Sequence, residues 1–192
     1  SASPHPRAET HQRKEILRAT TQDNLMAAFA GESQARNMYT YFAKVARKEG
    51  YHYIAKIFEE TAINEMRHAK DEFVLAGKLR DTAANLQEAI DGEHYETTTM
   101  YPEFAEQADA DGNKEAAILF RMIARVEAEH RDRYKKLLEM VKNGTVFKRD
   151  KPIRWKCSVC GYIHEGTEPP GKCPCCKHGK EYYEPEIGRA HV

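Results

Sequence analysis

Residues 60–70 read ETAINEMRHAK, and residues 123–133 read IARVEAEHRDR. Each stretch carries a glutamate followed three residues later by a histidine: Glu65 and His68 in the first, Glu127 and His130 in the second. Residues three apart on an α-helix lie on the same face, within one turn. If both stretches are helical, each therefore presents one carboxylate and one imidazole together, and the two pairs are 62 residues apart.

The spacing of 62 residues recurs along the chain and indicates that one helical hairpin has been used twice. The positions matched at this offset are Met38 and Met100, Tyr39 and Tyr101, Phe42 and Phe104, Ala43 and Ala105, Gly50 and Gly112, Phe58 and Phe120, and Ala62 and Ala124. Upstream, Gly31-Glu32 matches Gly92-Glu93 at an offset of 61. We therefore expect one additional residue between Glu93 and Met100, accommodated as a π-bulge, with a chance Gly-Glu match as the alternative.

Apolar residues recur at three- and four-residue steps from about residue 20 to residue 143, which is typical of amphipathic helices. Glycines stand where such helices would end. The pattern predicts four helices, over about 20–49, 52–76, 82–111 and 113–143, and hence an all-α antiparallel four-helix bundle. The expected domains are an N-terminal extension over 1–19, the bundle over 20–145, and a small C-terminal domain over 150–190.

Three further carboxylates belong to the same pattern. Glu32 lies among small and apolar residues in AFAGESQA, and Glu93 and Glu96 form another pair at a three-residue spacing. A lone charge costs several kcal/mol to bury, so acids that face the inside of a bundle need protons, partners or cations. Exposed helix charges are the alternative, because 31% of the chain is charged. The equivalent placement in both repeats favours a dinuclear metal site.

All five cysteines lie between residues 157 and 176, a clustering that indicates metal in a reducing compartment. Cys157-x-x-Cys160 and Cys173-x-x-Cys176 form two knuckles with twelve residues between them, and four such thiolates enclose one tetrahedral metal. The spacing suits a structural zinc as well as an iron that cycles between ferric and ferrous. Cys175 is predicted to be a spare thiol.

Four aromatic residues are expected to pack the small cysteine-rich domain. They are Trp155, Tyr162, Tyr182 and Tyr183.

The motifs GESQARNMY, ETAINEMRHAK, GEHYETTTMYPEFA and EAEHRDRY, together with the knuckles CSVCGY and CPCC, resemble the rubrerythrin family over residues from about 20 to 185. The resemblance implies a ferritin-like di-iron bundle followed by a rubredoxin-like domain with one tetrathiolate iron. The di-iron ligands that it implies are Glu32, Glu65, His68, Glu93, Glu96, Glu127 and His130.

The resemblance also implies roles for individual ligands. Glu65 and Glu127 would bridge the metals, and one iron would move between Glu96 in the oxidised state and His68 in the reduced state. From the residues alone, Tyr39 and Tyr101 are more often core residues than functional ones. The resemblance makes both of them hydrogen-bond donors to ligand carboxylates.

Composition excludes several other classes of function. Thirty basic residues balance thirty acidic ones, which leaves no excess charge to favour nucleic acid or an anionic membrane. No apolar run approaches the about 20 residues of a membrane span, and the first fifteen residues lack the apolar segment of a secretory signal. No G-x-G-x-x-G motif indicates direct binding of a nicotinamide. A cytoplasmic protein is expected.

A closed tetrathiolate iron passes electrons without binding substrate, whereas a carboxylate-rich di-iron site keeps positions open for an oxygen species. Their combination suggests that electrons enter at the tail and collect at the bundle, with hydrogen peroxide as the acceptor. The resemblance implies an NADH-linked peroxide reductase of oxidative-stress defence, with rubredoxin and its NADH-dependent reductase as donors, and a homodimer. The short 77–82 connection leaves an exchange of helices between subunits possible.

Two alternatives remain for the function. One is a ferroxidase or iron-handling protein of ferritin type that uses O2. The other is a non-enzymatic metalloprotein with a structural zinc in its tail.

Overall fold

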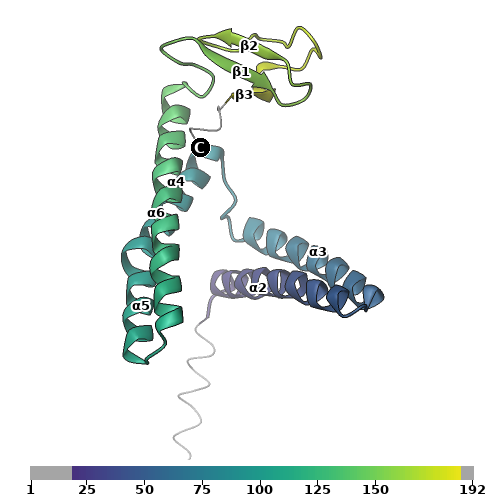
Figure 1. The fold of residues 1–192 in the computed structure, drawn as a ribbon, viewed down its shortest axis with the longest axis vertical. Coiled ribbons are helices and arrows are strands. Elements are labelled where there is room, and N and C mark those ends of the chain that lie inside the picture. The colour runs from purple at the N-terminus through teal and green to yellow at the C-terminus, as the bar shows by residue number, and fades with distance from the viewer. Residues whose placement is uncertain (1–18, 187–192) are drawn as a thin grey trace, which may run out of the picture. The chain divides into compact units, whose positions relative to one another are not determined.

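The computed structural model describes residues 19–186, which fall into two compact units, one ending at Arg80 and the other beginning at Asp81 (Figure 1). Each unit is described by itself. Apart from residue 19, the expected N-terminal extension 1–19 lies outside the described residues. None of the helices within the described range combines the length and apolarity needed to cross a bilayer.

The first unit is a hairpin of two antiparallel helices that pack side by side (Figure 1). They are α2 (Thr21–Lys48) and α3 (His52–Leu75). A capping box begins α2, because the Thr20 side chain accepts from the Asp23 amide at 3.1 Å and Asp23 accepts from the Thr20 amide at 2.9 Å. Gly50, at φ 87°, takes the left-handed conformation that lets the chain reverse. Buried alanines let the two helices approach closely.

The second unit opens with the equivalent hairpin. Its elements are α4 (Thr82–Tyr95), the π-helical segment η1 (Glu96–Met100), α5 (Tyr101–Ala110) and α6 (Lys114–Asn143). The Asp81 side chain accepts from the Ala84 amide at 2.8 Å to begin α4, and Asn113 accepts from the Ala116 amide at 3.1 Å to begin α6. The four predicted helical segments are confirmed, with ends that differ from the prediction by at most one residue.

The predicted irregularity in the third helical segment is confirmed. The π-helical segment Glu96–Met100 lies within the interval where the offset between the repeats changes from 61 to 62. A π-helical turn accommodates one more residue than the α-helical turn that it replaces. The first hairpin has a continuous α-helix, α2, in the equivalent place.

The rest of the second unit is a three-stranded antiparallel sheet with strand order β2-β1-β3. Its strands are β1 (Ile153–Cys157), β2 (Ile163–Gly166) and β3 (Tyr183–Pro185), with a 3-10 turn at Lys180–Tyr182. Trp155, Cys157, Cys173 and Tyr183 form its buried core. Tyr162 and Tyr182 were expected there as well, and that prediction is wrong, because both rings are exposed.

Candidate metal centres

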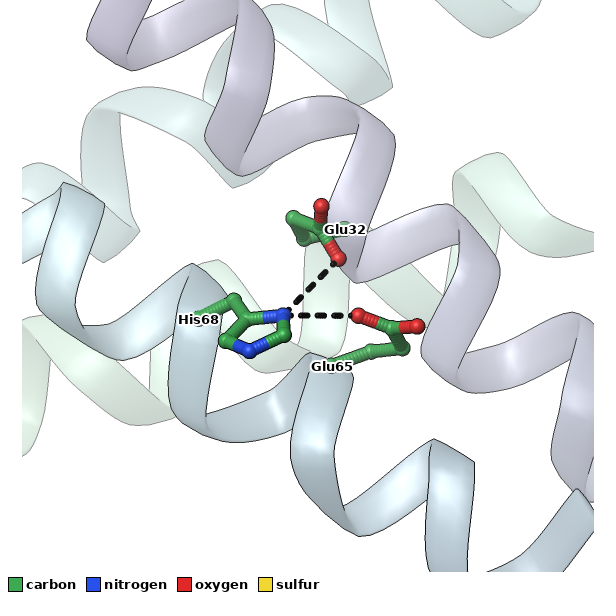
Figure 2. Close-up of polar contacts among 3 residues, drawn as sticks. All are labelled: Glu32, Glu65 and His68. Atoms are coloured by element: carbon green, nitrogen blue, oxygen red, sulfur yellow. Dashed lines mark hydrogen bonds and ion pairs between the residues drawn. The ribbon is translucent and has the colours of Figure 1, made fainter. Parts of the chain in front are cut away.

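The first cluster of metal-binding side chains belongs to α2 and α3. Figure 2 shows Glu32, Glu65 and His68 pointing toward one another from the two helices. His68 Nδ1 lies 2.9 Å from Glu65 Oε2 and 3.7 Å from Glu32 Oε2. One donor atom of each residue lies within 4.8 Å of the others, close enough to hold one cation.

The second cluster repeats this arrangement on α4 and α6. His130 Nδ1 lies 2.7 Å from Glu127 Oε2 and 3.5 Å from Glu93 Oε1, and these three residues also bring their donor atoms within 4.8 Å. In both clusters the histidine pairs with the glutamate three residues before it, and the facing helix supplies the other carboxylate. The three-residue spacing found in the sequence therefore produces the same local geometry twice.

The carboxylates within each cluster strongly affect one another. The hydrogen bond with Glu65 raises the pKa of Glu32, while the hydrogen bonds from Glu32 and then His68 lower the pKa of Glu65. Burial and then the hydrogen bond with Glu127 raise the pKa of Glu93. Two carboxylates this close share a proton, and both ionise only when a cation lies between them. The donor sets therefore fit divalent metal ions, which carboxylate and imidazole groups bind well.

Glu96 lies in the π-helical segment, close to the second cluster. Burial and then the charge of Glu127 raise its pKa. Burial and then the charges of Glu96, Glu127 and Glu93 raise the pKa of Tyr101, so this phenol faces the same carboxylates. Glu96 is outside the set whose donor atoms lie within 4.8 Å of one another. It belongs to a different compact unit from His68, with which it was predicted to alternate.

Tyr39 and Tyr101 occupy equivalent positions in the two hairpins. Their rings lie 6.0 Å, between centroids, from Phe58 and Phe120 respectively. Within residues 19–186, neither hydroxyl makes a hydrogen bond to a ligand carboxylate. Their predicted role as donors to such carboxylates stays a prediction.

The cysteine cluster is the third candidate centre. Cys157 Sγ lies 3.6 Å from Cys176 Sγ, and Cys160 Sγ lies 3.7 Å from Cys173 Sγ. A tetrahedron with metal–sulfur bonds of about 2.3 Å has edges of about 3.8 Å, so the four sulfurs fit one metal ion. Cys175 is exposed and lies outside this cluster.

The surroundings favour the thiolate form of Cys173, whereas, in spite of a hydrogen bond from the Tyr162 backbone, desolvation and the neighbouring thiols raise the pKa of Cys160 to about 12. Burial raises the pKa of Cys173, but the amides of Cys176 and Cys175 and the Tyr183 hydroxyl outweigh it and lower the pKa to about 6. His178, which sequence reasoning did not single out as a site residue, places Nδ1 3.3 Å from Cys176 Sγ. Its position two residues after a ligand cysteine was the available signal.

The chain matches the family model described as Rubrerythrin over residues 23–138, and the model described as Rubrerythrin, rubredoxin-like domain, over residues 155–184. The chain belongs to the rubrerythrin family. A rubrerythrin of Porphyromonas gingivalis is 46% identical, with 92% of this chain and 95% of the relative covered. A putative rubrerythrin of Methanocaldococcus jannaschii is also 46% identical, over 85% of this chain and 91% of the relative.

Nigerythrin, from Nitratidesulfovibrio vulgaris, is a more distant relative, at 36% identity over 85% of each chain. A solved structure of nigerythrin in a mixed-valence state covers 86% of both chains at 35% identity, with a TM-score of 0.34. As a rubrerythrin family member, the protein has a four-helix bundle followed by a small rubredoxin-like domain. Its Glu/His clusters supply ligands for di-iron, and its four-cysteine cluster supplies those for a mononuclear iron.

Proposed function

We propose that this protein is a non-haem di-iron peroxidase that reduces hydrogen peroxide to two molecules of water. Two electrons and two protons are consumed in each turnover, and the electrons arrive through the rubredoxin-like iron centre. The observation that supports this function is the presence, in one chain, of a closed four-sulfur site and of two carboxylate-rich clusters. The first has no free position for a substrate, whereas the second type of site keeps positions open.

The residues that would hold the di-iron centre are those of both clusters, together with Glu96. When bound, the di-iron centre supplies two electrons to the peroxide. His68 and Glu65 hold each other at 2.9 Å, and His130 and Glu127 at 2.7 Å, so these ligands are oriented before a metal binds. Tyr101 keeps its proton at neutral pH, because burial and nearby carboxylates raise its pKa, and it is the candidate hydrogen-bond donor beside Glu96.

Electrons reach the protein, we propose, from a rubredoxin and its NADH-dependent reductase. Among the ligand cysteines, Cys160 is exposed, and the neighbouring Val159 side chain is exposed as well. This edge of the tetrathiolate site is therefore open to a redox partner. A cytoplasmic location agrees with this role, because the ligand cysteines have to remain reduced.

We also propose a homodimer. Both units expose large apolar side chains, including Tyr51 and Tyr53 at 58% and 77% on the first and Ile118 at 59% on the second. Exposed apolar surface of this kind is typical of protein–protein interfaces. Sedimentation equilibrium would measure the mass directly, and a monomer at micromolar concentration would exclude the dimer.

Mixed dimers would reveal whether the two clusters of one centre come from one chain or from two. A Glu65→Ala chain has a defect in the first cluster only, and a Glu127→Ala chain has a defect in the second cluster only; the two chains would be refolded together. If a centre uses both clusters of one chain, every centre in the mixed dimer is damaged and no di-iron signal returns. If a centre combines clusters from two chains, one centre in the mixed dimer is intact and its signal returns.

The function itself is tested by stopped-flow spectroscopy of iron-loaded protein reduced without air. We expect the colour of the ferric tetrathiolate to return rapidly with stoichiometric peroxide and slowly with O2. Faster oxidation by O2 would instead indicate a ferroxidase or an oxidase. A tail that stays colourless after iron loading would contradict electron transfer through this domain.

A further inference from the structure

Tyr183 carries a buried hydroxyl group that has no hydrogen-bond partner among the described residues. Its residue is 4% exposed and belongs to β3, where it is paired with Cys157 of β1. A buried O–H group normally donates to an acceptor, because leaving it unpaired is costly. The unpaired hydroxyl therefore indicates an acceptor that forms only when the neighbouring cysteines bind a metal.

The described side chains packed around Tyr183 offer no hydrogen-bond acceptor other than the cysteine sulfurs. Its buried neighbours are Trp155, Cys157 and Cys173, and its partly buried neighbours are Phe147, Ile153 and Cys176. The Trp155 indole already donates to the Gly166 carbonyl at 3.0 Å and has no acceptor to give. A thiolate, in contrast, is a good acceptor, and metal ligation converts these cysteines into thiolates.

Burial and then the interaction with Cys173 raise the pKa of Tyr183 well above its usual range, in agreement with a phenol that packs against the ligand sulfurs.

We propose that Tyr183 is a positioning residue for the tetrathiolate iron: when the iron is bound, its hydroxyl donates a hydrogen bond to one of the ligand sulfurs that it packs against and raises the reduction potential of that iron. Reduction adds one electron, and the negative charge on the sulfurs increases. A donor aimed at one of those sulfurs stabilises the reduced form more than the oxidised form. The electron acceptor within the tail domain is thereby easier to reduce by an external donor.

The consequence for electron transfer rests on the proposed function, but the hydrogen bond does not. The reduction potential of the tail iron can be measured without peroxide and with the di-iron ligands mutated. A failure of the peroxidase assignment would leave the expected potential unchanged. A failure of the present proposal would leave the potential insensitive to Tyr183 while peroxide reduction continued.

The test compares Tyr183→Phe with Tyr182→Phe in the iron-loaded full chain. Tyr182 is the adjacent tyrosine but is 43% exposed and lies outside the buried core of the sheet, so it serves as the matched control. In a potentiometric titration, we expect Tyr183→Phe to weaken reduction about tenfold, which is about 59 mV for one electron, and Tyr182→Phe to leave it unchanged. Equal potentials for wild type and Tyr183→Phe, or equal shifts in both variants, would overturn the proposal.

A second measurement does not require the variant to fold normally. In wild-type protein loaded with cadmium-113, a hydrogen bond to a ligand sulfur makes the hydroxyl proton visible by NMR through its coupling to the metal. We expect one tyrosine hydroxyl proton with such a coupling, assigned to Tyr183. Complete absence of coupling to any tyrosine hydroxyl would overturn the proposal even if Tyr183→Phe failed to bind metal.

Discussion

The two helical hairpins have the same functional pattern but differ at three places. Each presents two carboxylates and one histidine whose donor atoms lie within 4.8 Å. Each also packs three aromatic rings together. They are Tyr39, Phe42 and Phe58 in the first hairpin, where the two phenylalanine rings lie 5.6 Å apart, and Tyr101, Phe104 and Phe120 in the second, where the two phenylalanine rings lie 5.7 Å apart. The similarity shows that the cluster and its packing are one unit, used twice.

The first two differences coincide in the second hairpin. Only there, within the described residues, does a π-helical segment interrupt a helix, and this segment begins with Glu96. The first hairpin has no carboxylate at the position equivalent to Glu96, where the offsets of 61 and 62 fall on Ala35 and Gln34. The additional carboxylate lies in the π-helical segment, and it makes the second cluster chemically different from the first. A site with unequal halves suits two metals with unequal roles.

The third difference is a reversed ion pair near the turn of each hairpin. Arg47 on α2 pairs with Glu59 on α3, whereas the equivalent pair is Asp109 on α5 with Arg121 on α6. Pairing α2 with α6 at this level would bring Arg47 and Arg121 together. The reversal therefore favours the observed hairpins over mispaired ones.

The largest effect on metal binding is expected from a single substitution that removes one carboxylate from either cluster. Glu65→Ala and Glu127→Ala should each abolish di-iron assembly, because the two residues occupy equivalent positions in the repeats. The colour of the tail iron should remain and serves as the internal control. Metal analysis and visible spectra would test this, and wild-type iron content and activity in either variant would refute the ligand assignment.

Glu96→Gln tests the asymmetry between the hairpins. The variant keeps the π-helical segment and the side-chain shape but loses the charge, so both clusters should still bind metal. We expect the rate of peroxide reduction to fall by at least about 10- to 100-fold, which is the loss typical when a hydrogen-bond partner of a metal ligand is removed. Glu103→Gln, on the exposed side of α5, is the control. Equal rates in both variants would mean that Glu96 has no special role.

Metal uptake should depend on pH because protons and metal ions compete for the carboxylate pairs. The pKa values of Glu32 and Glu93 are raised, so these groups hold protons at pH values where an ordinary glutamate is ionised. Affinity should therefore increase as pH rises through the raised pKa and then level off. Calorimetry in buffers of different ionisation enthalpy, with the tail site filled by zinc, would count the released protons.

In Glu32→Gln protein, fewer protons should be released per metal bound. A proton release independent of this substitution would contradict the shared proton at the first cluster.

The smallest effect is expected from the reversed ion pairs. Glu59→Arg places two arginines together, and since both side chains are about half exposed, we expect the Tm to fall by up to about 4 °C. Adding Arg47→Glu should restore it. A thermal melt that shows no recovery in the double variant would mean that the pair does not help to hold the hairpin.

Much of this arrangement was predictable from residues alone. The three-residue spacing of Glu65 and His68, repeated in Glu127 and His130, places each pair on one face of a helix. The offset between the two repeats changes from 61 to 62 residues, and this change located the π-helical segment. Cysteine spacing likewise identified the four ligands that cluster. These features depend on local geometry, which sequence periodicity reports directly.

Contacts made by the short strands and turns of the small domain were not predictable in the same way. Nothing in the spacing distinguishes the buried Tyr183 from the exposed Tyr182, because β3 has only three residues and its register is set by pairing with β1. The approach of His178 to Cys176 depends on the turn after the second knuckle, where Lys177 adopts φ 66°. Short strands and turns carry too little periodicity to show which way a side chain faces.

We propose that the two clusters are halves of one dinuclear centre. Mössbauer spectroscopy of the oxidised, iron-57-loaded protein tests it most directly. We predict a diamagnetic doublet from two coupled ferric ions, alongside the tetrathiolate signal, with an area ratio of about two to one. Magnetically isolated ferric ions in the two clusters, without coupling between them, would contradict the claim.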